Sequence, residues 1–445
     1  MLVKEFKKTL WLAIPLIISN IAQVGHGLID SAMVGSIDYK QLAASSLVIN
    51  AVAIPQVICI GLTIAITAMV SISRGQKNET AASNYLYNGF VLNTLASIAI
   101  ALLCTFSTPL LYHLGQDPDI IPIAQPYFVI MAWALVPMTM FLSIKQFSDA
   151  LEFTRTGMML ALFSLVLNAF FCWLLVFGNW GFPRMELLGA GLATFISRFL
   201  VAIVMAIIVY KHHAYKAYMR VRAQAWKLSR KTWKELLHIG IPSGLQLSME
   251  TGAFSLSGIM VGWLGATVQA AHQIALNCAT ATFMAIVGLS MGASIRTSHA
   301  YGSKQMHRLS LIGRSTMWGG LLYGASTGLF YVLFRHQLPL LFNTDPAVVA
   351  MAAQLLLVAA IFQVSDSLQA IGAGVCRGIK DMKVPTILVT IAYWGIGIPA
   401  GYWLAFVKGF GAAGIWWGFV FGLSMAAIFL NKRFLKMVTR LEKNS

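Results

Sequence analysis

Three carboxylates stand inside stretches that are otherwise apolar: Asp30, Glu250 and Asp366. A charge at the centre of a bilayer costs at least a few kcal/mol unless it faces a cavity, a partner or a bound cation. We therefore interpret the three acids as sites for an ion or a proton; the alternative is a neutral acid hydrogen-bonded between helices. A buried carboxylate can take up a proton and release it when hydrated. Because Glu250 and Asp366 fall in the same half of the chain, they can instead share a Na⁺ ion, a hard cation that prefers oxygen ligands.

Amide side chains accompany the acids at helical spacing. Gln246 precedes Glu250 by one turn, so the two side chains share a helix face. Gln363 and Gln369 share a helix face with Asp366. Other amides expected to line a cavity or to contact substrate are Asn20 and Gln23 before Asp30, Asn168, and the pair Gln273 and Asn277. For each amide the alternative is a helix–helix contact. His26, four residues before Asp30, is either a proton relay or a hydrogen-bonded structural residue.

The elements that must position these residues are membrane-spanning helices. With 58% apolar and 11% charged residues the chain is not an ordinary soluble globule, and about 20 apolar residues suffice to cross a bilayer. Twelve spans are predicted, near residues 10–35, 41–73, 82–112, 121–146, 157–178, 187–210, 236–262, 268–297, 308–335, 347–376, 384–407 and 412–434. The predicted fold is an all-α integral membrane protein with six helices in a first lobe, 1–210, and six in a second lobe, 236–445. The basic segment between them, 211–235, is interpreted as a solvated cytoplasmic linker.

The two lobes are copies of one sequence. Subtracting 227 from the residue number places Pro242 on Pro15 and Gly288 on Gly61, and no gap is needed between these positions. The same offset relates Met260-Val261-Gly262 to Met33-Val34-Gly35, Gly252 to Gly25, Asn277 to Asn50, Ser298 to Ser71 and Gly302 to Gly75. Six spans per copy give both copies one orientation, so a pseudo-two-fold axis along the membrane normal is expected.

Basic residues gather in the loops on one side of the predicted spans. The formal net charge is +17, but the bases lie in short loops and at the termini with few aromatic residues between them, which argues against binding of nucleic acid. The positive-inside rule places these loops, the linker and both termini in the cytoplasm. We therefore expect a multi-pass protein of the cell inner (plasma) membrane, in contact with membrane lipid.

Neither a cofactor nor an enzyme activity is indicated. The five cysteines are scattered through apolar spans without metal-ligand spacing and are expected to be buried, with no disulfide and no zinc. The HExxH, GxSxG and GxxxxGK[ST] patterns are absent, so we predict that the chain is not an enzyme and does not itself use ATP. Energy would come from a gradient of Na⁺ or H⁺, or from the gradient of the substrate.

Four segments carry a resemblance to a known family. They are GLIDSAMVG at Asp30, LVLNAFFCWLLVFG at Asn168, IPSGLQLSMETGAF at Glu250 and QVSDSLQAIGAGVCRGIKDMKVP at Asp366. Over essentially its full length the chain resembles the multidrug and toxic compound extrusion (MATE) transporters, and acids in the first, seventh and tenth spans are most similar to the NorM-like branch. The resemblance implies two six-helix lobes that form a V around a central cleft. It also implies export of cationic or amphipathic drugs and dyes by alternating access, in exchange for Na⁺ or H⁺.

The resemblance also implies roles for individual residues. Glu250 and Asp366 are expected to bind the coupling cation, and Asp30 with Asn168 to serve proton coupling or substrate binding. The tyrosine expected shortly before the tenth-span acid is Phe362 here, so a Na⁺ site would lack one oxygen and the coupling ion stays open. The alternative function is a lipid-linked precursor flippase of the related superfamily, for which basic residues would be expected in the cleft. We expect a monomer.

Overall fold

The structure, a computed structural model, describes residues 1–113 and 119–443, and every regular element within them is helical. Residues 444 and 445, the end of the predicted second lobe, lie outside the described residues. Eleven helical stretches of the described residues are long and apolar enough to cross a membrane, with Ile121–Ala150 and Lys383–Val407 each counted as one stretch. The helix α10 (Arg230–Gly262) has 33 residues but is more polar, because Gln246 and Glu250 interrupt its apolar run. The prediction of an all-α integral membrane protein is confirmed.

The helices of the first sequence copy correspond to the first six predicted spans. They are α1 (Leu2–Gly35), α2 (Tyr39–Gly75), α3 (Glu79–Phe106), α4 (Ile121–Trp133), α5 (Leu135–Ala150), α6 (Thr154–Phe177) and α7 (Glu186–Lys211). The fourth predicted span consists of two helices: α4 ends at Trp133 and α5 begins at Leu135.

The helices of the second copy correspond to the last six predicted spans. After α10 they are α11 (Ala266–Gly302), α12 (Met306–Phe334), α13 (Pro346–Gly378), α14 (Lys383–Thr390), α15 (Ile398–Tyr402) and α16 (Gly411–Lys443). The eleventh span contains α14 and α15 together with two π-helical segments, Ile391–Gly397 and Trp403–Val407. Segments of this kind insert an extra residue into a helical turn and redirect the side chains that follow.

The chain folds into two compact units that do not follow chain order. The N-unit comprises Ile18–Gly244, and the C-unit comprises Met1–Ile17 together with the chain from Leu245 onward. The predicted partition at residues 210 and 236 follows the sequence repeat, whereas compactness divides the chain inside α1 and inside α10. In the C-unit, the buried Arg296 holds the first turns of α1 by donating hydrogen bonds to the Glu5 carbonyl oxygen (2.6 Å) and to Thr9 Oγ1 (2.7 Å).

Glycines allow close helix crossings where α1 and α10 pass from one unit to the other. A Cβ atom added to Gly61 on α2 would lie 2.3 Å from Gly244 Cα on α10. A Cβ atom added to Gly288 on α11 would lie 2.8 Å from the backbone nitrogen of Ile17 on α1. Gly61 of the first crossing corresponds to Gly288 of the second by the repeat offset of 227 residues (288 − 61), and Ile17 corresponds to Gly244 by the same offset (244 − 17). The two crossings are therefore copies of one another, one in each unit.

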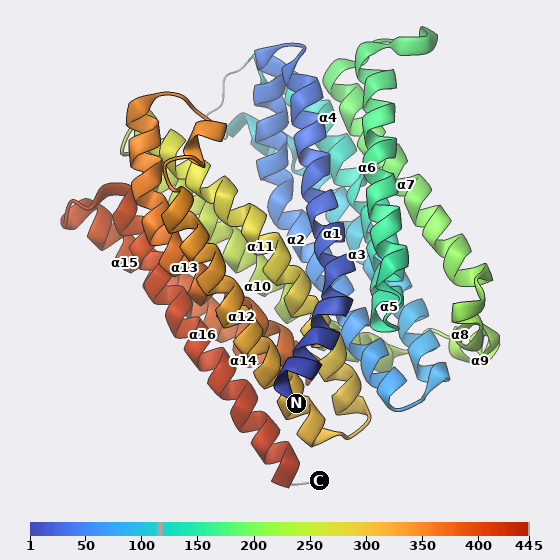
Figure 1. The fold of residues 1–445 in the computed structure, drawn as a ribbon. Helices are drawn as coiled ribbons and strands as arrows, with labels where there is room; N and C mark the ends of the chain where they lie inside the picture. The colour runs from blue at the N-terminus through green and yellow to red at the C-terminus, as the bar shows by residue number, and fades with distance from the viewer. Residues whose placement is uncertain (114–118, 444–445) are drawn as a thin grey trace. The chain divides into compact units, whose positions relative to one another are not determined.

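Each unit is organised around a helix that packs on several neighbours. In the C-unit α13 packs against α11, α12 and α16, and Figure 1 shows α12, α13 and α16 running side by side. In the N-unit α7 packs against α4, α5 and α6. These contacts place α13 and α7 where their polar side chains meet residues of other helices.

The basic linker is docked on the N-unit, which differs from the expected solvated connector. It contains two short helices, α8 (Lys216–Arg220) and α9 (Arg222–Ala225). Tyr215 is buried and its hydroxyl lies 2.7 Å from Ser148 Oγ on α5. Trp226 stacks on Tyr87 of α3 at a ring-centroid distance of 5.5 Å. The aromatic residues of the linker anchor it, while its basic side chains stay at the surface.

Candidate functional site

In the N-unit, α1 places Asp30 against α6 and α7. Asp30 is 5% exposed. Thr194 Oγ1 on α7 donates a hydrogen bond to Asp30 Oδ2 at 3.0 Å, and Cys172 Sγ on α6 donates one to Asp30 Oδ1 at 3.4 Å. Both carboxylate oxygens therefore accept a fixed donor, which holds the side chain in one orientation.

Asn168 extends this contact into a short chain of hydrogen bonds. Its Nδ2 atom donates to Thr194 Oγ1 at 3.1 Å, and Thr194 in turn donates to Asp30. A hydroxyl group has only one hydrogen to donate. Because Thr194 donates it to Asp30, the Thr194 oxygen is the acceptor for Asn168 and the Asp30 oxygen is the acceptor for Thr194. Asn168 is thus linked to Asp30 through Thr194, and it also interacts with the Asp30 carboxylate itself.

Polar atoms without partners surround the Asp30 cluster. Among the described residues, His26 Nδ1, Asn168 Oδ1 and Tyr127 Oη are buried and have no hydrogen-bond partner. The charge of Asp30 also interacts with that of Arg198 on α7, which donates a hydrogen bond to the Ala134 carbonyl oxygen at 3.3 Å. Buried polar atoms of this kind are usually satisfied by ordered water or by a ligand. The cluster can therefore accept water, a proton or a polar substrate group.

In the C-unit, α10 and α13 meet at Glu250. This carboxylate is partly buried, and its Oε1 atom accepts hydrogen bonds from Gln246 Nε2 (3.0 Å) and from Gln369 Nε2 (2.9 Å). Gln246 lies one turn earlier on α10, whereas Gln369 comes from α13. Two amide donors to one oxygen stabilise negative charge on that oxygen, and neither donates to Oε2.

Asp366 lies on α13 within electrostatic range of Glu250. It is 4% exposed, and the described residues provide no hydrogen-bond donor to its carboxylate. The negative charges of the two acids repel one another. Two unit charges close together at an effective dielectric constant near 20 repel by a few kcal/mol, so this pair favours the uptake of a proton or a cation.

Two further groups lie within range of this pair. Tyr393, in the π-helical segment Ile391–Gly397, interacts electrostatically with Glu250 and Asp366. Its hydroxyl is an oxygen that Phe362 cannot supply, because a phenylalanine side chain carries none. The Phe362 ring instead packs edge-on against Trp416, with 5.5 Å between the ring centroids. The sequence reasoning missed Tyr393, and only its aromatic type inside a span hinted at it.

The second group is Arg377, in the last turn of α13. The nearby Asp381 accepts hydrogen bonds from Arg433 (2.5 and 3.0 Å). Arg377 is 8% exposed, its Nε atom has no hydrogen-bond partner among the described residues, and its charge interacts with that of Glu250.

Other predicted residues do not converge on the carboxylates. Gln273 and Asn277 are exposed on α11 and bond to each other, with 3.1 Å between Nε2 and Oδ1. Gln23 is exposed, and Asn20 is partly buried with an unpartnered Nδ2 atom. Gln363 donates to Thr282 Oγ1 at 2.9 Å instead of to an acid. These amides are separate from the two clusters in the residues described.

Comparisons with known proteins place these clusters in a family. The family model MatE matches residues 15–174 and 242–403, two segments that begin 227 residues apart (242 − 15). The chain is 32% identical over 98% of its length to a probable multidrug resistance protein NorM of Rhizobium meliloti, of which 94% is covered. It is 30% identical over 97% of its length to the multidrug resistance protein NorM of Photobacterium profundum, of which 95% is covered.

Solved structures agree with the fold. The eukaryotic MATE transporter AtDTX14 superposes with a TM-score of 0.88 at 20% identity, with 100% of this chain and 99% of that chain covered. A point mutant of the Vibrio cholerae MATE transporter VcmN gives a TM-score of 0.90 at 18% identity, with 99% and 98% covered. Fold, duplication and full-length identity converge: the chain is a multi-pass membrane transporter of the MATE family, in its NorM-like branch.

Proposed function

We propose that the chain is a cation-coupled multidrug antiporter that exports cationic or amphipathic compounds by alternating access. The observation that carries this proposal is the pair Glu250 and Asp366, two acids in mutual repulsion of which Asp366 has no protein donor among the described residues. A coupling cation, Na⁺ or H⁺, would be taken up by this pair and released on the other side of the membrane. The names of the NorM relatives, multidrug resistance proteins, support substrates that are drugs.

Each of these C-unit residues would have a separate role in binding or releasing the cation. Gln246 and Gln369 hold one oxygen of Glu250, which leaves its other oxygen and Asp366 to meet the cation. For Na⁺, the Tyr393 hydroxyl would offer a further oxygen ligand. Arg377 would act as a fixed positive charge that competes with the mobile cation and so promotes its release.

The N-unit cluster would provide a second site. The Asp30 carboxylate, with Thr194 and Asn168 behind it, would attract the positive charge of a drug or hold a proton in its place. A drug bound there would displace a proton or water from the unpartnered atoms of the cluster. We further propose that the protein works as a monomer in the inner membrane, with both termini in the cytoplasm.

The test is drug efflux from proteoliposomes in which Na⁺ and pH gradients are imposed separately. We expect Glu250→Gln and Asp366→Asn each to lower gradient-driven efflux by about tenfold or more, since each removes one charge of the pair. Glu152→Gln is the matched control, because Glu152 forms a loop salt bridge with Arg74 at 3.0 Å. Full activity of both site variants would refute the coupling role, and lipid scrambling independent of either gradient would favour a flippase instead.

A further inference from the structure

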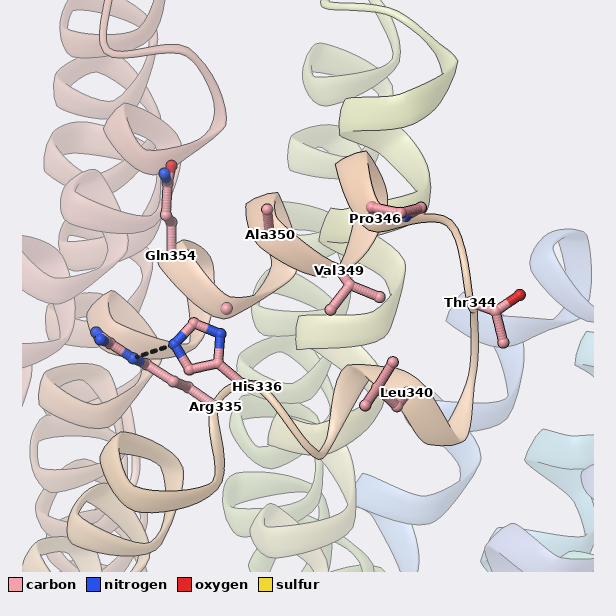
Figure 2. A pocket seen from close by; sticks show the side chains of 9 residues that line it. Arg335, His336, Leu340, Thr344, Pro346, Val349, Ala350 and Gln354 are labelled. Atoms are coloured by element: carbon pink, nitrogen blue, oxygen red, sulfur yellow. Dashed lines mark hydrogen bonds between the residues drawn. The ribbon is translucent and has the colours of Figure 1, made fainter.

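A hollow lies in the C-unit between the end of α12 and the start of α13. Its volume is about 540 Å³. Its walls are mainly apolar and include Leu340, Val349 and Ala350, while Arg335 and His336 form a polar edge. Figure 2 shows the Arg335–His336 pair at one end of the hollow and Thr344 toward the other. Because α12 and α13 both span the membrane, the hollow lies at a membrane–water interface.

Arg335 brings an unneutralised positive charge to this hollow. Arg335 Nε donates a hydrogen bond to His336 Nε2 at 3.1 Å. Among the described residues Arg335 forms no salt bridge, and none of those that line the hollow is acidic. The neighbouring Asp345 is engaged as the helix cap, where its Oδ1 atom accepts a hydrogen bond from the Ala347 backbone nitrogen at 2.8 Å. The guanidinium Nη atoms therefore remain free to bind a planar or tetrahedral oxyanion.

The surroundings of the hollow are suited to lipid. Leu333 at the end of α12 is 63% exposed, and Leu341 and Phe342 beside the hollow are 77% and 52% exposed. An apolar surface of this kind at a helix end contacts acyl chains in a membrane, whereas a soluble anion such as free phosphate gains nothing from it. The cationic substrates of the proposed function would be repelled by Arg335, so the hollow does not suit them.

We propose that this hollow binds an anionic phospholipid, with its phosphate on Arg335 and His336 and its acyl region against Leu340 and Val349. None of the residues that line the hollow is acidic, so the lining itself offers no carboxylate to the ammonium group of a zwitterionic lipid. The bound lipid class is therefore one with net negative charge, for which phosphatidylglycerol is a suitable probe. The site is distinct from the carboxylate clusters and does not depend on the identity of the coupling ion.

The test is photocrosslinking of the full-length protein in vesicles of phosphatidylcholine that contain a photoactivatable phosphatidylglycerol. In the wild type we expect the label on residues 335–354. Arg335→Gln should lower this labelling by about tenfold, the usual effect of losing a hydrogen bond to a charged group. The matched control is Arg184→Gln, which removes one exposed positive charge at another helix end, where Arg184 pairs with Glu186 at 3.4 Å.

A second variant keeps the proposal testable if Arg335→Gln does not fold. Ala350→Phe fills the hollow from an exposed position and leaves the charge of Arg335 in place, so it should also lower the labelling. Equal labelling of the wild type, Arg335→Gln and Ala350→Phe would overturn the proposal. So would equally strong labelling of residues 335–354 by a photoactivatable phosphatidylcholine, or labelling that Arg184→Gln lowers as much as Arg335→Gln.

Discussion

The three acids differ in how the protein satisfies their oxygens. Asp30 accepts donors on both oxygens, Glu250 accepts two amides on one oxygen, and Asp366 accepts none from the described residues. A carboxylate with fixed donors on both oxygens is held in place, whereas one without donors gains most when a mobile cation arrives. The exchange of the coupling ion is therefore expected to centre on Asp366 and the free side of Glu250.

Gln369 is expected to set the affinity of Glu250 for the coupling cation. Replacing it by methionine removes a donor 2.9 Å from Glu250 Oε1 and nearly preserves the side-chain volume. One charge-assisted hydrogen bond contributes about 1.5–3 kcal/mol, so a change of about tenfold or more in the half-saturating cation concentration for efflux is expected. The measurement is drug efflux from proteoliposomes over a range of Na⁺ concentrations and of pH.

Gln363 offers a matched control on the same helix. It is also 1% exposed, but it donates to Thr282 Oγ1 and not to an acid. Gln363→Met should lower the thermal stability without changing the cation dependence. If Gln363→Met and Gln369→Met shift the cation dependence equally, the effect belongs to packing of α13 and not to Glu250.

Helical spacing within one span explains which partners could be predicted. Gln246 could be assigned to Glu250 because four residues separate them on one helix. Thr194 and Cys172 could not be assigned to Asp30, because they are 164 and 142 residues away in sequence and meet it only through helix packing. The interaction of Arg377 with Glu250 could not be predicted for a related reason: Arg377 follows Gln369 by eight residues on α13, and its depth depends on how the helix is covered.

At the scale of elements, the glycine crossings fix how α1 and α10 are shared between the units. The repeat offset could be predicted from sequence, because it needs only coincident residue types. The division of α1 and α10 between the two units could not be predicted, because local sequence does not specify which helix crosses at Gly61 or Gly288. Pro15 and Pro242 each lie two residues before the point of exchange, where a proline interrupts the helical hydrogen bonds.

Gly61→Ala should destabilise the protein. The added methyl group would meet the backbone of Gly244 at 2.3 Å, and a backbone cannot move aside as a flexible side chain can. Overpacking of this kind costs about 1–3 kcal/mol, which lowers the midpoint of thermal unfolding. Intrinsic tryptophan fluorescence during heating in detergent measures this midpoint.

Gly258→Ala is the control for helix propensity. A Cβ atom at Gly258 on α10 meets nothing within 4 Å, so this variant should be as stable as the wild type or about 0.5–1 kcal/mol more stable. Equal midpoints for Gly61→Ala and Gly258→Ala would show that the crossing of α2 and α10 is looser than the structure has it.

At the scale of the whole molecule, the number of spans and the sidedness of the loops depend on α10. It is the one long helix of the described residues that is not apolar enough to be identified as a span by hydropathy. The polar residues that lower its mean hydropathy, Gln246 and Glu250, are hydrogen-bonded to each other in the proposed cation site. The feature that makes α10 hard to identify as a span is therefore also the feature that gives it a function. Mean hydropathy alone would therefore assign eleven spans and place the two termini on opposite sides of the membrane, whereas the span predicted near residues 236–262 makes twelve and places both termini on one side.

Cysteine labelling of two loops decides between these topologies. Lys227 on the linker and Gln337 after α12 are exposed and are separated by α10, α11 and α12, so twelve spans place them on opposite sides. The five native cysteines are buried and should give little background. With a membrane-impermeant maleimide, Lys227→Cys should react only in inverted vesicles and Gln337→Cys only in right-side-out vesicles, as the positive-inside rule requires of the basic linker. Labelling of both variants from the same side would show that α10 does not cross the membrane, and the proposed cation site between α10 and α13 would then have to be abandoned.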